Sequence, residues 1–197
     1  GLQRSSDYLK WAPSGTTGYN KKFTNIVCTS SQTGSGSALT ATFTGDTDGS
    51  DNWEYICSID PEGTQDAATN YPAYNFALTY GTTAGITETD YENGWYVPSI
   101  AELCEVYKNK EVIQTSLNAA GGFTFGTSWY WSSSQSASYN SNAYQVDFDD
   151  GPLYDNDKAN DDSRVLVLQA FNAEQFNNYE VTPSITSVTI NPTTVGE

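Results

Sequence analysis

Residues 94–107 read GWYVPSIAELCEVY and carry the clearest signal for local structure in this chain of 197 residues. Ser99 and Glu102 have the spacing of a capping box, in which the serine oxygen accepts from the backbone amide of Glu102 and the carboxylate bonds back to the serine amide. The apolar residues that follow recur at helical spacing, which predicts a helix with one buried face. They are Ile100, Leu103, Cys104 and Tyr107. The Cys104 thiol should therefore lie inside the protein.

Helices are expected on both sides of this segment, and strands mainly after it. One helix should cover 72–80 and stop at Gly81, and a weaker one should cover 110–120 and stop at Gly121-Gly122. After Gly122 the pattern changes to a period of two, which is typical of strands. The expected strands cover 23–28, 39–44, 128–133, 143–148, a short piece around Leu153, and 164–171.

Two of these strands have distinctive patterns. From Tyr144 to Asp149 the even positions are apolar and the odd positions are polar, which predicts one packed face and one wet face. Residues 165–168 are apolar on both faces, which predicts a central strand.

The composition is acidic and aromatic. The chain has 24 Asp and Glu against 8 Lys and Arg, a net charge of -16. Such a surface repels phosphate groups, so nucleic acid and anionic membranes are not expected as partners. No apolar run reaches the length of about 18 residues that a membrane span needs. Fourteen Tyr and five Trp, with no Met or His, are typical of a loop-rich extracellular domain.

Catalysis is not expected. Without histidine, the chain cannot form a Ser-His-Asp or Cys-His site. Carboxylate pairs such as Asp149-Asp150 and Asp161-Asp162 lie in polar segments of the sequence. Such segments do not provide the apolar pocket that would separate the two pKa values into an acid and a base role.

The cysteines and one acidic turn raise the question of cross-links and metals. Cys28 and Cys57 flank a loop-rich segment and are expected to form a disulfide, which leaves Cys104 free. Asp46, Asp48 and Asp51 alternate as in a calcium loop, but the twelve-residue spacing that ends in Glu is missing. A solvated turn is the preferred interpretation, and calcium is the alternative. No other cofactor is expected.

Three motifs in this order resemble one protein family. They are GWYVPSIAEL at 94–103, YWSSS at 130–134, and a closing hydrophobic strand that ends with QAF at 169–171. Together they resemble the domain at the C-terminus of the Legionella collagen-like protein, which recurs in bacterial surface proteins and is similar to formylglycine-generating enzymes. The resemblance covers 51–171. It implies an α+β, C-type-lectin-like fold with short helices packed on small antiparallel sheets and long loops, in a secreted, lipoprotein or other cell-surface context.

The resemblance also suggests how the chain is divided. Residues 1–171 should form the lectin-like domain, and 172–182 should be a linker. Apolar and polar residues alternate in 183–197, and this segment resembles the start of a bacterial immunoglobulin-like domain. The native protein is therefore expected to be longer and modular. Two functions known in related proteins are not expected. The cysteine pair of the formylglycine-generating enzymes has no counterpart after position 57 except Cys104, and the sugar-binding tripeptides of animal lectins do not occur.

The candidate binding surface lies between 133 and 163, where 20 of 31 residues are Ser, Asn, Asp or Tyr. Polar and tyrosine-rich loops held by fixed apolar positions are typical of binding loops. We therefore expect an adhesin-type domain that binds a protein or glycan ligand at a cell or host surface. The candidate ligand-binding residues are Trp131, Tyr139, Asn140, Asn142, Tyr144, Gln145, Asp147, Asp149, Tyr154, Asn156 and Asp161.

Three alternatives remain open for this surface. The segment resembles the variable regions that diversity-generating retroelements randomise at adenines, with the same candidates apart from Trp131 as variable positions. The domain could instead be a structural repeat without a ligand. An enzyme of the formylglycine-generating kind is the third alternative, and it would need a reactive Cys104.

Overall fold

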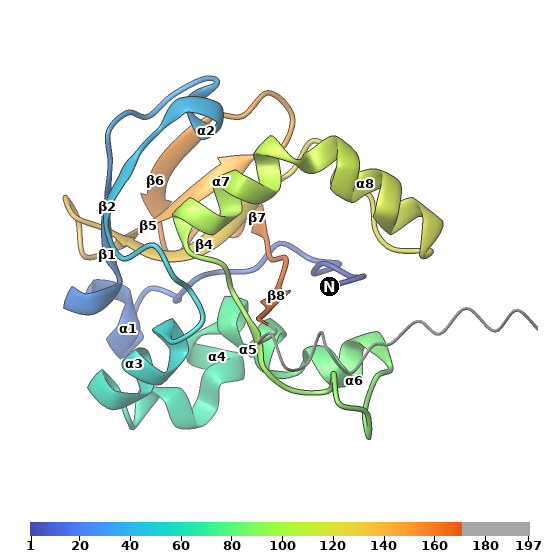
Figure 1. Ribbon diagram of the computed structural model, residues 1–197. Coiled ribbons are helices and arrows are strands. Elements are labelled where there is room, and N and C mark those ends of the chain that lie inside the picture. Colours follow the sequence, from blue (N-terminus) through green and yellow to red (C-terminus); the bar gives the residue numbers. More distant parts are fainter. Residues whose placement is uncertain (171–197) are drawn as a thin grey trace, which may run out of the picture.

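Within residues 1–170, which this computed structural model describes, short helices pack on two small sheets in a mixed α+β arrangement (Figure 1). The larger sheet has the order β2-β1-β4-β5-β6, with β7 beside β4, and the smaller pairs β3 with β8. The strands are β1 Val27–Ser30, β2 Phe43–Gly45, β3 Trp95–Tyr96, β4 Trp129–Ser136, β5 Asn142–Asp147, β6 Leu153–Asp157, β7 Ser163–Arg164 and β8 Leu168–Gln169. The expected linker at 172–182, the immunoglobulin-like start at 183–197 and Phe171 lie outside the described residues.

The helices form two groups around the larger sheet. In Figure 1, α7 lies in front of the sheet, α8 extends from it to the right, and α3 to α6 gather below the sheet. The α-helices are α1 Thr17–Asn20, α2 Ser37–Thr40, α3 Asn52–Ile59, α4 Ala67–Asn70, α5 Pro72–Leu78, α6 Tyr80–Ala84, α7 Ile100–Lys108 and α8 Lys110–Ala119. Two short 3-10 helices, Thr24–Ile26 and Gly63–Asp66, complete the set in the described part of the chain.

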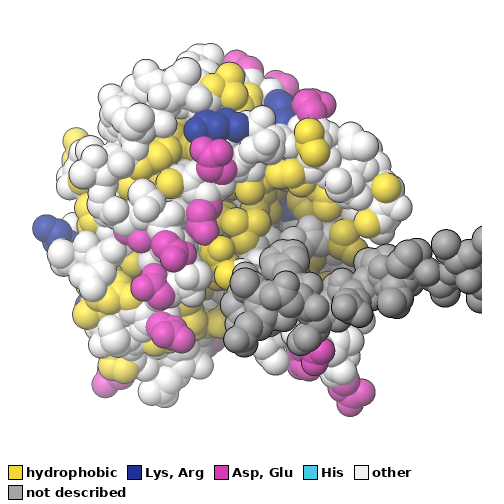
Figure 2. All heavy atoms as spheres, viewed as in Figure 1, with side chains coloured by type: hydrophobic (Ala, Val, Ile, Leu, Met, Phe, Trp, Pro, Cys, Tyr) yellow, Lys and Arg dark blue, Asp and Glu magenta, His cyan; other side chains and the backbone are white. Residues whose placement is uncertain are grey.

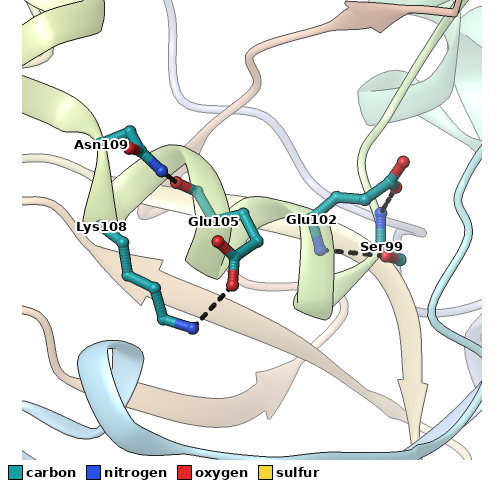
Figure 3. A network of polar contacts seen from close by, with 5 residues as sticks. All are labelled: Ser99, Glu102, Glu105, Lys108 and Asn109. Carbon is teal, nitrogen blue, oxygen red and sulfur yellow. Dashed lines mark hydrogen bonds and ion pairs between the residues drawn. The ribbon is translucent and has the colours of Figure 1, made fainter.

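Helix α7 begins with the capping box that its sequence predicts. The Ser99 side chain accepts from the Glu102 amide at 3.3 Å, and the Glu102 carboxylate accepts from the Ser99 amide at 2.8 Å (Figure 3). At the other end of the helix, Lys108 forms an ion pair with Glu105 at 2.7 Å. The predicted apolar face is buried, with Cys104 among its residues. Local sequence therefore determines this helix.

The acidic turn before α3 packs against the start of α7. The amide of Gly49 donates to the Glu102 carboxylate at 2.9 Å, and the Ser99 hydroxyl donates to the Thr47 carbonyl at 2.7 Å. A Cβ on Gly49 would lie 2.6 Å from both the Ser99 nitrogen and the Val97 oxygen. These are backbone atoms, so they cannot move aside as a flexible side chain would.

We therefore expect Gly49→Ala to lower the free energy of unfolding by about 1–3 kcal/mol, the usual cost of overpacking. Urea denaturation followed by tryptophan fluorescence measures this change. Gly36→Ala is the control, because a Cβ there meets nothing within 4 Å and only the positive φ of 70° is strained. The interpretation fails if Gly49→Ala costs no more than Gly36→Ala.

The larger sheet separates two hydrophobic clusters. On one face, α7 packs on Tyr130, Tyr144 and Val146 of the central strands. On the other face, residues from the N-terminal segment and α3 to α5 pack around Trp131. Neither the helices nor the N-terminal segment can be removed without uncovering a face of the sheet.

Residues 165–168 do not form the central strand that their sequence predicts. Val165 and Val167 belong to the cluster around Trp131, whereas Leu166 belongs to the α7 cluster. Residues 165–167 run between the two cores outside any strand, and Leu168 pairs only with Tyr96 in the smaller sheet. The prediction that this segment is buried on both sides is thus correct. The burial arises because the segment lies between two hydrophobic clusters, and not because it is a central strand.

Several element boundaries also differ from prediction. Strand 128–133 extends to Ser136, while 23–28 and 39–44 each contain part of a short helix followed by the start of a strand. Gly81 lies inside α6, and Gly85 with φ of 67° ends that helix instead. Gln145 is buried although its position was expected to be wet.

The predicted disulfide between Cys28 and Cys57 is wrong, because all three cysteines are free thiols. Cys28 on β1 is fully buried in the cluster that contains Cys104. Cys57 lies on α3, whose Ile56 packs in the other cluster. The sheet therefore separates the two residues for which the sequence predicts a disulfide.

Candidate functional site

Strand β5 lies between β4 and β6, and its side chains alternate between the two faces of the sheet. Antiparallel register places Trp129 opposite Asp147 and Tyr154 opposite Gln145. Because opposite residues in a sheet point to the same face, these four side chains share the face away from α7. Asn156, two residues beyond Tyr154, shares it as well.

The N-terminal segment covers one half of this face. The Trp131 indole nitrogen donates to the Leu9 carbonyl at 2.7 Å, and Trp131 has no exposed surface. Gln145 is also buried and accepts from the Ser163 hydroxyl. Tyr144 points to the opposite face, where its hydroxyl accepts from the Ser30 amide at 3.4 Å and only 6% of the residue is exposed. These three candidates are interior residues, so we remove them from the candidate binding surface.

The open half of the face is a band that we call the outer strip, made of Trp129, Asp147, Tyr154 and Asn156. Its two rings have centroids 6.0 Å apart and are inclined at 43°. Tyr154 is 45% exposed, and the other three residues are partly exposed. Two carbon-rich rings thus reach solvent beside a carboxylate and an amide.

Polar contacts fix the edges of the outer strip. The Asn156 amide donates to the Asp162 carboxylate at 3.2 Å, and its oxygen accepts from Asn160 at 2.8 Å. The Asp147 carboxylate accepts from the Asp149 amide at 2.9 Å. These bonds restrict the polar side chains, which lowers the entropy cost of presenting them to a partner.

The remaining candidates lie on loops or at a strand end. The turn between β4 and β5 carries Tyr139, which is 64% exposed, and Asn140, and Asn142 is the first residue of β5. Asn142 closes this turn by donating its amide to the Tyr139 carbonyl at 3.1 Å. Asp149 and Asp161 are exposed on the loops that follow β5 and β6.

Trp129 is the member of the outer strip that is absent from the candidate residues proposed from the sequence. It lies two residues before Trp131 and therefore points to the same face. The two-residue spacing is visible in the sequence. The sequence does not show that the N-terminal segment covers Trp131 and leaves Trp129 exposed.

The calcium candidates are used within their own turn. The Asp46 carboxylate accepts from the Asn52 side chain at 2.8 Å and from the Asp48 amide at 3.2 Å, while Asp48 accepts from the Ser50 amide at 2.9 Å. Burial raises the pKa of Asp46. Among the described residues, no group of three or more His, Cys, Asp or Glu is arranged to hold a metal ion. Asp46, Asp48 and Asp51 therefore do not form such a group. The turn is better explained as a support for α3 and α7.

The buried thiols have little nucleophilic character. Burial raises the pKa of Cys104 to about 12 and that of Cys28 to about 11. Because the thiolate is the reactive form, neither group is activated at neutral pH.

Two apolar hollows lie beside α7 and α8, and neither is lined by a residue of the outer strip. One of about 560 Å³ includes Phe43, Val106 and Leu168, and the other of about 520 Å³ includes Trp95 and Leu117. Figure 2 shows hydrophobic side chains gathered in this region. Glu102, Glu105 and Lys108 also line the first hollow, but they bond to one another or to the start of α7, which leaves few polar groups free to orient a small ligand.

Comparisons with known proteins add one distant structural similarity. No family model and no curated protein matches the chain. A solved fimbrial protein from Bacteroides ovatus is similar over 84% of this chain, with 18% identity and a TM-score of 0.48. The similarity covers 33% of that protein, so this chain spans about a third of its length. Across residues 1–170, no helix has the length and apolar character to cross a bilayer.

Proposed function

We propose that this chain is a surface-exposed or secreted bacterial binding domain of the adhesin type, which recognises a protein or glycan through the outer strip and the Tyr139 turn. The carrying observation is the outer strip itself, where Trp129 and Tyr154 reach solvent on an otherwise covered sheet face. Aromatic side chains with adjacent hydrogen-bonding groups are the usual anchors of binding surfaces. A rigid sheet beneath them suits such a role, because little order has to be gained on binding.

The proposed family, a C-type-lectin-like domain of the formylglycine-generating type, is supported by how the three motifs meet. The Ser133 amide donates to the Pro98 carbonyl at 2.8 Å, and the Ile100 amide donates to the Ser134 hydroxyl at 2.9 Å. Trp95 pairs with Gln169 in the smaller sheet. Segments that are far apart in sequence thus form one contiguous structural unit, which gives a physical reason for their occurrence together.

Among the alternatives for the surface, burial favours an ordinary adhesin surface over a diversified one. A retroelement target must tolerate many residues at each variable position. Tyr144 and Gln145 are buried, and substitutions there would disturb the core. An enzyme that depends on Cys104 is disfavoured by the raised pKa and burial of that thiol.

The proposal is tested with the triple variant Trp129→Ala, Tyr139→Ala and Tyr154→Ala. Fluorescently labelled protein is applied to a printed array of glycans and extracellular proteins. We expect the wild type to bind a defined subset and the variant to lose at least about tenfold in affinity, because hot-spot aromatics typically contribute about 2 kcal/mol or more each.

Exposed apolar residues elsewhere provide the control. Leu39→Ala and Val112→Ala remove side chains that are 53% and 71% exposed on α2 and α8. These changes should leave the binding pattern intact. Equal binding by the triple variant, or no binding to any ligand class by the wild type, would contradict the proposed function.

A further inference from the structure

We propose that the outer strip docks a basic segment of a protein partner, with an arginine or lysine side chain placed over Trp129 and Tyr154. This inference rests on the proposed binding function and specifies the kind of partner. It follows from the aromatic rings of the open sheet face and from the charge around them.

The rings of the outer strip have no cation of this protein's described residues over them, although several other aromatic rings do. Elsewhere, Lys110 lies 4.6 Å from the centre of the Tyr107 ring, and Arg164 lies 4.5 Å from that of Tyr8. Within residues 1–170, no Lys or Arg of the chain lies over Trp129 or Tyr154. The negative faces of these rings are therefore available to an external cation.

Acidic groups flank the strip at both ends. Asp147 belongs to the strip, and its carboxylate is bonded to the amide of Asp149 in the following turn. At the other end, Asp162 is bonded to Asn156, and Asp161 is exposed beside it. A cation over the rings would have carboxylates within reach on either side.

The basic residues near the strip are already engaged. Lys110 donates to the carbonyls of Phe148 and Asp149 at 3.0 Å each. Arg164 donates to the Ser5 carbonyl at 3.1 Å and to the Ser128 hydroxyl at 3.3 Å. Lys158 is fully buried. Hydrogen bonds to neutral oxygens leave Lys110 and Arg164 charged, but the carboxylates around the strip outnumber them; these are Asp147, Asp149, Asp161 and Asp162. The surroundings of the strip are therefore negative on balance, and the whole chain carries a net charge of -16.

This charge distribution favours a basic protein segment over a glycan. Carboxylates on both sides would repel an acidic sugar. A neutral sugar would feel no long-range electrostatic attraction to them. A basic segment is attracted from a distance and then gains both cation–π and charge-assisted contacts. Arginine suits the site best, because its planar guanidinium can stack on a ring while it bonds to carboxylates.

The test is a titration of the isotopically labelled 197-residue chain with the capped tripeptide acetyl-Gly-Arg-Gly-amide, followed by nuclear magnetic resonance. Acetyl-Gly-Gln-Gly-amide and methyl glycosides are titrated in parallel. We expect the arginine peptide to cause saturable shifts at the Trp129 indole and the amides around Asp147 and Tyr154, with a dissociation constant on the order of millimolar. The glutamine peptide should cause none, and salt at about 0.5 M should weaken the arginine peptide severalfold.

Substitutions at Tyr154 separate a cation–π site from a merely apolar one. Tyr154→Phe keeps the ring and should keep the affinity. Tyr154→Leu keeps apolar surface but removes the ring, and we expect a loss of about two- to fivefold. Asp162→Asn should also weaken binding. Glu111→Gln removes an equal charge from an exposed site on α8 and should not.

Three outcomes would overturn the inference: no saturable shift at the strip with the arginine peptide, equal affinity for the glutamine peptide, or equal losses for Glu111→Gln and Asp162→Asn. If a glycoside shifts the strip and the arginine peptide does not, the basic partner is wrong while the proposed binding face stands. If neither probe shifts the strip and the triple variant retains full binding on the array, both proposals fail.

Discussion

Trp131→Ala is expected to lower the free energy of unfolding by about 3–5 kcal/mol, the usual cost of removing a buried tryptophan. Trp131 has no exposed surface and packs in the cluster around Trp11 and Tyr74. Its indole also bonds to the Leu9 carbonyl, which would lose its partner. Because a domain of this size is stable by only about 5–15 kcal/mol, the variant should be close to unfolding. Urea denaturation measures the change.

Trp129→Ala is the matched control for this prediction. The same residue type is removed from the same face of the same strand, two positions earlier, but Trp129 is partly exposed on the outer strip. We expect a cost of about 1 kcal/mol there. If Trp131→Ala instead abolished ligand binding with its stability unchanged, Trp131 would be a binding residue and our assignment of it to the core would be wrong.

Lys158→Met is expected to make the protein more stable at about pH 6.5, and this advantage should shrink by about 3 kcal/mol as the pH rises to about 9.5. Lys158 is fully buried, and its ammonium donates to the Gly18 carbonyl at 3.3 Å. It lies 4.3 Å from the centre of the Trp11 ring and 5.2 Å from that of Phe23. Methionine fills similar volume without a charge to desolvate.

The sign follows from proton binding in the two states. Burial lowers the pKa of Lys158 from 10.5 to about 7, although the nearby Asp157 carboxylate opposes the change. Between these values the unfolded chain binds more protons than the folded chain, so wild-type stability increases with pH in this range. Below about pH 7 the lysine is charged in both states, and folding carries the full desolvation cost. The variant lacks this dependence.

Comparison with the variant separates the contribution of Lys158 to the pH dependence of stability from the contributions of other titrating groups. The N-terminal amine, whose pKa burial lowers to about 6, is common to both proteins and cancels. Lys22→Met removes a lysine from an exposed position and serves as the charge control. Equal pH dependence of wild type and Lys158→Met would show that the lysine reaches solvent in the folded state.

The sequence was most informative where structure depends on neighbours along the chain. Helix α7 begins and buries its residues as predicted, because a capping box and an apolar face act within one or two turns. Helix α8 covers Lys110–Ala119, close to the predicted 110–120. The same logic failed for 165–168, where two separate cores produce an apolar run that looks like a central strand.

The candidate site was predicted as a region but not residue by residue. Alternation along β5 correctly indicated that neighbouring side chains point to opposite faces. It did not show which part of each face another segment covers. Residues 5–12 lie more than a hundred positions before Trp131 in the chain, yet Leu9 bonds to that indole. Long-range coverage of this kind leaves no periodic signal in the strand itself.

The sequence by itself therefore determined the start of α7, its buried face, the acidic balance of the chain and the polar, tyrosine-rich character of residues 133–163. Each is a property of composition or of spacing within a few residues. Only the tertiary structure decided that Cys28 and Cys57 lie on opposite sides of a sheet, that Trp131 is interior, and that Trp129 and Tyr154 share an open strip. The physical reason is that burial depends on which distant segments pack against a face, and packing is a property of the whole fold.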